Sequence, residues 1–196
     1  MTGMLTIAQI QSARVDGVLE AAAEWRQHSG CLAEIADEFR VNVVGGVDRS
    51  GWTGPAATGA QARMEAELQE LEAAQQRAAA ISAALERAAD EFRAAQLHLL
   101  GALDSAEGQG FQVHPDGSVE IPPDPDADPA TTGLRQSAAT QTAAEVRAAQ
   151  EEATQADEQA VIDLRAATGP DVGAGGVGGG PVGGGAGGVA GEAVGA

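Results

Sequence analysis

The 196-residue chain contains neither lysine nor tyrosine, and only 3% of its residues are aromatic. Without lysine it has no phosphate-loop lysine, no Schiff-base lysine and no lysine general base. Its 11 basic residues, all arginines, stand against 29 acidic ones, for a net charge of −18. An acidic chain with no basic stripe is a poor match for nucleic acid or anionic lipid, so neither is expected as a partner.

Other absences exclude further classes. The single cysteine, Cys31, rules out an internal disulfide, and no Cys/His spacing suits structural zinc. No run of 18 apolar residues could span a membrane. The first ten residues lack a basic region followed by an apolar one, so we expect no cleaved signal peptide and a cytoplasmic chain before any export.

Alanine supplies much of the 43% hydrophobic content but buries little area. Because large apolar residues are sparse, any core must be narrow and elongated. Composition and periodicity predict an all-α fold, a long antiparallel helical hairpin followed by smaller parts. The final 28 residues include 14 glycines. They can bury too little apolar area to offset the conformational entropy lost on ordering, so we expect a disordered tail. The predicted parts are a helical hairpin (1–107), a β-hairpin with an acidic Pro-rich linker (108–133), a third helix (134–168) and the tail (169–196).

Apolar residues repeat every seven positions in both long helical stretches. A 3.5-residue repeat keeps one stripe facing a partner, as in coiled coils. We expect these rows to form the seam of the hairpin and the core shared with a partner, with Trp25, Leu32, Phe39, Leu71, Leu85 and Phe92 as its large members. The rows are Val18, Trp25, Leu32, Phe39 with Ala22, Ser29, Ala36, Val43, and Met64, Leu71, Ala78, Leu85, Phe92, Leu99 with Leu68, Gln75, Ser82, Ala89, Gln96, Leu103.

Glycine and proline mark the predicted helix ends. Gly45-Gly46 should end the first helix, because glycine adopts the left-handed cap conformation. Pro55 suits the first turn of the second helix, where its missing N–H costs nothing.

After Glu107 the pattern alternates between apolar and polar residues around Asp116-Gly117. Asp-Gly between such runs predicts a short β-hairpin, here with strands of about four residues. An isolated hairpin is marginal in water, so we expect Phe111, Val113 and Ile121 to rest on a helix.

No catalytic, metal or cofactor site stands out. The acidic run at 124–128 lacks the glycine and glutamate of a calcium loop, and its linker role is favoured. His28, His98 and His114 have no partner ligand at helical spacing, and Cys31 has no oxyanion loop, so we expect a small, partly buried cysteine. We therefore expect no enzyme activity.

Trp52 lies in the turn between the two long helices, within Gly51-Trp52-Thr53-Gly54. A tryptophan carries too much apolar area to be left in water, so it must cap the turn or contact a partner. This turn, its central position and the flanking heptads resemble the WXG-type substrates of actinobacterial type VII (ESX) secretion, over residues 5 to 107. The later hairpin, Pro-rich stretch and Ala-rich helix are similar to longer relatives with an N-terminal targeting domain.

The resemblance implies a bundle formed by dimerisation, with a small WXG-like helical-hairpin protein or with a second copy. It also implies export without a cleaved signal, recognition by the secretion ATPase, a secreted or surface location, and an export turn at Trp52 and Gly54. The family pairs that turn with a Tyr-x-x-x-Asp/Glu motif, and this chain has no tyrosine. Either a partner supplies that half, or export follows another route, or the chain is not exported.

Three functions remain open at this stage. The favoured one is a type VII secretion substrate or secretion-associated interaction protein. The others are the detached targeting domain of a secreted effector or hydrolase, and a cytosolic coiled-coil chaperone for a secretion substrate.

Overall fold

The computed structural model describes residues 3–123 and 128–169, and 83% of them are helical. The elements are α1 (Ile7–Ser12), α2 (Val15–Glu38), a π-helix η1 (Phe39–Val44), α3 (Gly45–Ser50), α4 (Pro55–Gly108), strands β1 (Gln112–Val113) and β2 (Val119–Glu120), and α5 (Pro129–Thr168). A mostly helical chain with a long helix pair and one tiny sheet confirms the coarse fold prediction. The predicted tail lies outside the described residues, apart from Gly169.

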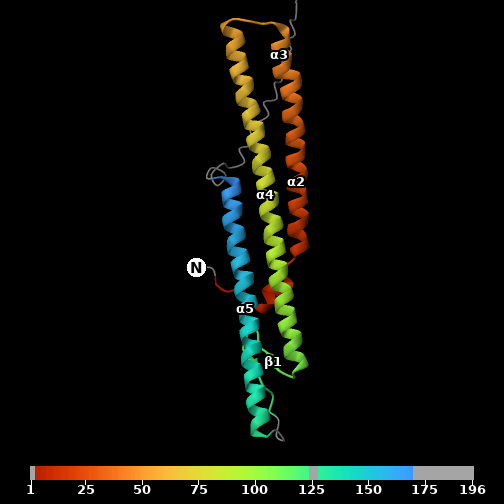
Figure 1. The fold of residues 1–196 in the computed structure, drawn as a ribbon, viewed down its shortest axis with the longest axis vertical. Helices are drawn as coiled ribbons and strands as arrows, with labels where there is room; N and C mark the ends of the chain where they lie inside the picture. The colour runs from red at the N-terminus through yellow and green to blue at the C-terminus, as the bar shows by residue number, and fades with distance from the viewer. Residues whose placement is uncertain (1–2, 124–127, 170–196) are drawn as a thin grey trace, which may run out of the picture.

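Helices α2 and α4 lie side by side along the molecule (Figure 1). Small residues of the predicted heptad rows fill the seam, and Ala22, Ala36, Ala78 and Ala89 are all buried. Two hydroxyls bridge the helices: Ser82 Oγ donates to the carbonyl of Ala22 at 2.8 Å, and Ser29 Oγ donates to that of Gln75 at 3.2 Å. Rising numbers on α2 meet falling numbers on α4, so the two helices run in opposite directions.

The first long helix does not end at Gly45-Gly46, and that prediction was wrong. The chain continues through η1 and α3, and Gly51 ends it with a left-handed φ of 68°. The wider π turns shift the heptad phase. Val43, expected in the seam, is consequently 40% exposed. The start of α4 was predicted correctly, with Pro55 in its first turn.

Helix α5 packs along the C-terminal half of α4, and α1 closes the gap between them. This three-helix region holds the main core, which contains Ile7, Ile10, Ala95, Leu99, Ala102, Val146, Ala149 and Ala153. The N-terminal segment is tied to α5 through one residue: the N–H of Leu5 donates to Thr154 Oγ1 at 3.0 Å, and its carbonyl accepts from Gln150 Nε2 at 3.1 Å. The three-helix region is therefore better packed than α2 and α4 alone.

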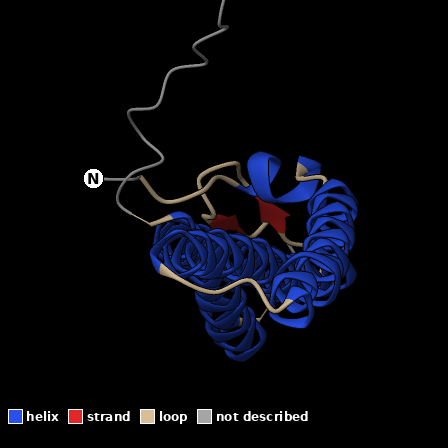
Figure 2. Ribbon diagram, turned by 90° about the horizontal axis from the view of Figure 1, so that it is seen from above, coloured by secondary structure: helices blue, strands red, loops and turns tan. Residues whose placement is uncertain are grey.

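The β-hairpin lies against the helices, as the end-on view shows (Figure 2). Its strands have two residues each, shorter than predicted, with Val113 paired to Val119. Phe111 packs on Ala106 and Ala139, with Val113 and Ile121 around it. The prediction that these hairpin residues pack against a helix is therefore confirmed. In the turn, Asp116 accepts hydrogen bonds from the hydroxyl and the N–H of Ser118, which hold its pKa below the ordinary value.

Replacing Gly117 by alanine tests the contact between the hairpin and α5. Gly117 has φ of 85°, and a Cβ there would lie 2.7 Å from Gln150 Oε1. The backbone strain costs about 1–2 kcal/mol, and displacing the buried Gln150 amide adds about 1–3 kcal/mol. Urea unfolding followed by circular dichroism measures the loss. Gly110→Ala is the control, because Gly110 has φ of 72° and open space around it; equal losses would contradict the contact.

The N-cap of α5 predicts a specific pH dependence. Asp128 accepts from the N–H and hydroxyl of Thr131 and from the N–H of Ala130, and these bonds hold its pKa below its ordinary value of 3.8. A lowered folded-state pKa stabilises the fold above 3.8 and loses that effect as pH falls through the folded-state pKa. The stability advantage over Asp128→Asn should therefore be present at neutral pH and shrink below pH 3.8. A gap that stays constant down to strong acid would contradict it.

Candidate docking surface

The α2–α4 pair has two long sides of different chemistry. One side is bridged by ion pairs, Arg26 with Glu86, Arg40 with Glu72, and Arg93 with Asp16, the last at 2.8 Å. Hydrogen bonds that Arg40 donates to Glu72 and then to Asp37 raise the pKa of Arg40 above its ordinary value. All these side chains are substantially exposed, so the pairs contribute little stability but keep this side polar.

The opposite side, here called the apolar side, carries the large members of the heptad rows. Because the two helices are antiparallel, the large residues of the α2 row and those of the α4 row lie along the same side of the pair. Residues of both rows line one cleft of about 310 Å³, Val18 from α2 and Leu85 and Phe92 from α4. The rows are Val18, Trp25, Leu32 and Phe39 on one helix, and Met64, Leu71, Ala78, Leu85 and Phe92 on the other.

Helix α5 reaches the apolar side only near the start of α2. Val161 and Leu164 of α5 close the cleft over Leu85 and Phe92. The last ion pair between α5 and α4 joins Asp163 to Arg87 at 2.7 Å, and α5 ends at Thr168. Figure 1 shows that α5 stops well short of the turn joining α3 to α4.

Beyond that end, no element among the described residues packs over the apolar side. The uncovered stretch, here called the open apolar face, consists of Trp25, Leu32, Ile35, Phe39, Met64 and Leu71. Trp25 is 38% exposed and Ile35 50%, while the other four are half-buried. Exposed apolar side chains of this kind make this stretch a candidate interaction site.

The turn with Trp52 lies at the far end of the open apolar face, remote from the β-hairpin (Figure 1). Gly51 and Gly54 bound it with φ of 68° and 101°, conformations that other residues rarely adopt. The N–H of Trp52 donates to Ser50 Oγ at 3.2 Å, and 49% of the residue is exposed. The turn therefore presents tryptophan to solvent instead of folding it back as a cap.

The structure separates the residues expected to meet a partner into two groups. Leu85 and Phe92 lie half-buried beneath the end of α5, and Trp25, Leu32, Phe39 and Leu71 lie in the open apolar face. Their contact with a partner remains a prediction. Sequence reasoning missed Ile35, which falls outside the seven-residue rows but three residues after Leu32, on the same face of α2. Cys31 is exposed, against expectation, because it points away from the seam.

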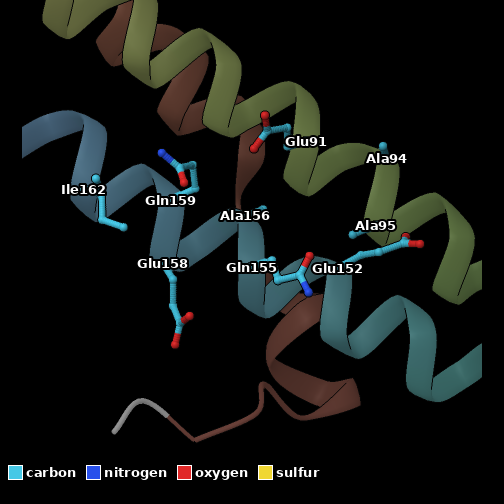
Figure 3. A pocket seen from close by; sticks show the side chains of 9 residues that line it. All are labelled: Glu91, Ala94, Ala95, Glu152, Gln155, Ala156, Glu158, Gln159 and Ile162. Carbon is cyan, nitrogen blue, oxygen red and sulfur yellow. The ribbon is translucent and has the colours of Figure 1, made fainter.

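A second groove, of about 620 Å³, runs between α4 and α5. Its lining includes Glu91, Glu152 and Glu158, whose carboxylates point in different directions (Figure 3). Glu152 instead meets His98, with its oxygen 3.0 Å from Nδ1. Within the described ranges, no group of three or more His, Cys, Asp or Glu residues could hold a metal ion. The groove therefore offers no converging set of polar groups for binding or chemistry.

Comparisons with known proteins leave the family unassigned: no family model, no curated protein and no solved structure matches the chain. In residues 3–123 and 128–169, no helix has the length and apolarity needed to cross a membrane.

Alanine substitutions distinguish this surface from the core. Leu99 is fully buried, so Leu99→Ala should lower the free energy of unfolding by about 2–5 kcal/mol. Ile35 is half exposed, so Ile35→Ala should cost less than about 1 kcal/mol. Urea unfolding of the two variants measures both values. A loss at Ile35 as large as that at Leu99 would mean that the open apolar face supports the fold of the isolated chain.

Proposed function

We propose that this chain is a type VII (ESX) secretion substrate or a secretion-associated interaction protein, working through a helical bundle. The observation that carries the proposal is the exposed tryptophan turn at the end of a two-helix arm with an uncovered apolar face. This combination agrees with the WXG-type resemblance, in which a helical hairpin carries the export turn at its tip. No part of the proposal needs catalysis or a cofactor.

Under this proposal the open apolar face binds a partner. Two helices with one apolar stripe each enclose only a shallow core, and further helices complete it. Here α5 lies beside the pair only near the start of α2, and the remaining length is left for a small WXG-like protein or for a second copy. Trp25 would be the strongest single contributor to binding, because tryptophan is enriched among the residues that dominate binding energy.

Trp52 and Gly54 would form the contact with the secretion ATPase. An exposed indole offers a large apolar area and one N–H donor, a combination enriched at binding sites. Gly54 lets the backbone turn sharply into α4 at φ of 101°. Because the chain has no tyrosine, the second half of the family's export signal would come from the partner. The product would be secreted or held at the cell surface without cleavage of a signal peptide.

The export role is tested with Trp52→Ala in an actinobacterial host with an active type VII system. Since Trp52 is half exposed, its loss should change stability by less than about 1 kcal/mol. Export should fall at least about tenfold, as for a binding hot spot. Immunoblots of culture filtrate and cells measure export, and circular dichroism measures stability.

Leu134→Ala is the matched control, because Leu134 is a more exposed apolar residue near the other end of the bundle. It should leave export unchanged. Secretion of Trp52→Ala at the wild-type level would contradict the proposed role of the turn. Retention of the wild-type chain in the cytosol during active secretion would favour a cytosolic chaperone instead.

A further inference from the structure

The segment that carries the Trp52 turn has no buried side chain to hold it. No residue of η1 or α3 is buried, and 49% of Trp52 is exposed. Helix α3 packs on η1 and has little contact with α4, although the turn joins these two helices. The glycines at the two ends of the turn, Gly51 and Gly54, allow many backbone conformations. Packing therefore does not set the direction in which the turn presents its tryptophan, and hydrogen bonds must do so.

Ser50, the last residue of α3, connects the turn to its own helix. The Ser50 hydroxyl accepts a hydrogen bond from the N–H of Trp52 at 3.2 Å and donates one to the carbonyl of Val47 at 2.6 Å. Because the second bond fixes the hydroxyl on the helix, the first bond fixes the Trp52 N–H relative to α3. One serine therefore joins the tryptophan backbone to the last turn of the helix.

Asp48 and Gln61 join the helices on either side of the turn. Gln61 Nε2 of α4 donates to Asp48 Oδ1 of α3 at 3.1 Å. In the part of the chain that the structure describes, no other hydrogen bond links α3 to α4. This single bond spans the turn, so it limits the angle at which α3 meets α4.

Arg49 connects α3 to the π-helix. Helical side chains point toward the N-terminus of their helix, and Arg49 Nη2 donates to the carbonyl of Val41, eight residues earlier, at 3.2 Å. The guanidinium lies over Gly45, where a Cβ would be 3.1 Å from Nη1, so the glycine leaves the space that this contact uses. Hydrogen bonds thus hold the end of α3 from η1, from α4 and from within α3 itself.

We infer that Ser50, Arg49 and the Asp48–Gln61 pair are positioning residues, which hold the Trp52 turn in one orientation before a partner binds. This inference rests on the proposed function, in which the turn contacts the secretion machinery. A turn that is already ordered loses less conformational entropy on binding, so it binds more tightly than the same residues in a mobile turn. The indole makes the contact, and the positioning residues act through it.

Amide NMR relaxation of the full chain measures the order of the turn. In the parent chain the amides of Trp52 and Thr53 should have order parameters close to about 0.85, as in rigid backbone. Ser50→Ala and Gln61→Ala should each lower these values, and the double variant should bring them below about 0.6, because both sides of the turn are then released. Ser50→Thr keeps the hydroxyl and Asp48→Asn keeps an acceptor, so both should match the parent.

Export is measured on the same variants by immunoblots of culture filtrate and cells. One hydrogen bond contributes about two- to tenfold in binding. Ser50→Ala should therefore lower export by about that factor, which is less than the loss for Trp52→Ala, and Ser50→Thr should restore it. Circular dichroism confirms that each variant is folded.

Two exposed hydrogen bonds of α5 provide matched controls. Ser137 Oγ donates to the carbonyl of Gly133 at 3.1 Å, so Ser137→Ala is the control for Ser50→Ala. The side chain of Gln141 donates to a carboxylate at 3.1 Å, so Gln141→Ala is the control for Gln61→Ala. Neither control should change export or the order of the turn.

Three results would overturn the inference. The first is an order parameter at Trp52 that the double variant leaves unchanged. The second is parental export of the double variant although its turn is mobile, because the partner would then order the turn itself. The third is failure of Ser50→Thr to restore order and export. Unchanged export of Trp52→Ala removes the proposed function, whereas the order parameters test the hold on the turn independently of export.

Discussion

The close contact between α2 and α4 through alanine and serine is the constraint on which the rest of the structure depends. Ala22, Ser29 and Ala36 face Ala78, Ser82 and Ala89, and the serine hydroxyls donate to backbone carbonyls across the seam. Side chains this small let the helices approach closely, but they bury little apolar area. The large apolar residues are displaced to one edge of the seam, where a two-helix pair cannot enclose them.

Helix α5 reaches that edge only near the start of α2 and leaves the N-terminal half of α4, with the part of α2 beside it, open. The half of α4 beside α5 has a core of isoleucine, leucine, valine and alanine, closed by α1 and held by Gln150 and Thr154 against Leu5. The open half has a polar side tied by ion pairs and an apolar side with half-exposed tryptophan, leucine, isoleucine and phenylalanine. This division gives the molecule one firmly packed end and one end suited to binding.

Much of this arrangement could be predicted from the sequence, because it follows from local patterns. Seven-residue spacing indicated the long helix pair, Asp116-Gly117 the hairpin turn, and Pro55 the start of α4. Two features could not be predicted. The π turns at Phe39–Val44 have no counterpart in the seven-residue spacing, and Gly45-Gly46 was predicted as the helix end although the helix ends at Gly51. The packing of α5 on α4 depends on alanines, whose small size gives a weak periodic signal in the sequence.

The residues of the candidate surface were predicted from the sequence, but how far the surface extends was not. The rows containing Trp25 and Leu71 were expected in a core, but their burial depends on where α5 ends, and heptad spacing says nothing about that. Trp52 was expected to cap the turn or contact a partner; its 49% exposure argues against a buried cap, and contact with a partner remains a prediction. Ion pairs on one side and apolar rows on the other became visible only once the direction of packing was known.

Hydrogen–deuterium exchange of the full chain, read at single-residue resolution along α4, tests the central claim most directly. The account predicts strong protection from Ala84 to Ala106, where α5 covers the helix, and clearly weaker protection from Ala57 to Ile81, where it does not. Uniform protection along the whole of α4 would contradict it, because the apolar side would then be covered from end to end in the isolated protein.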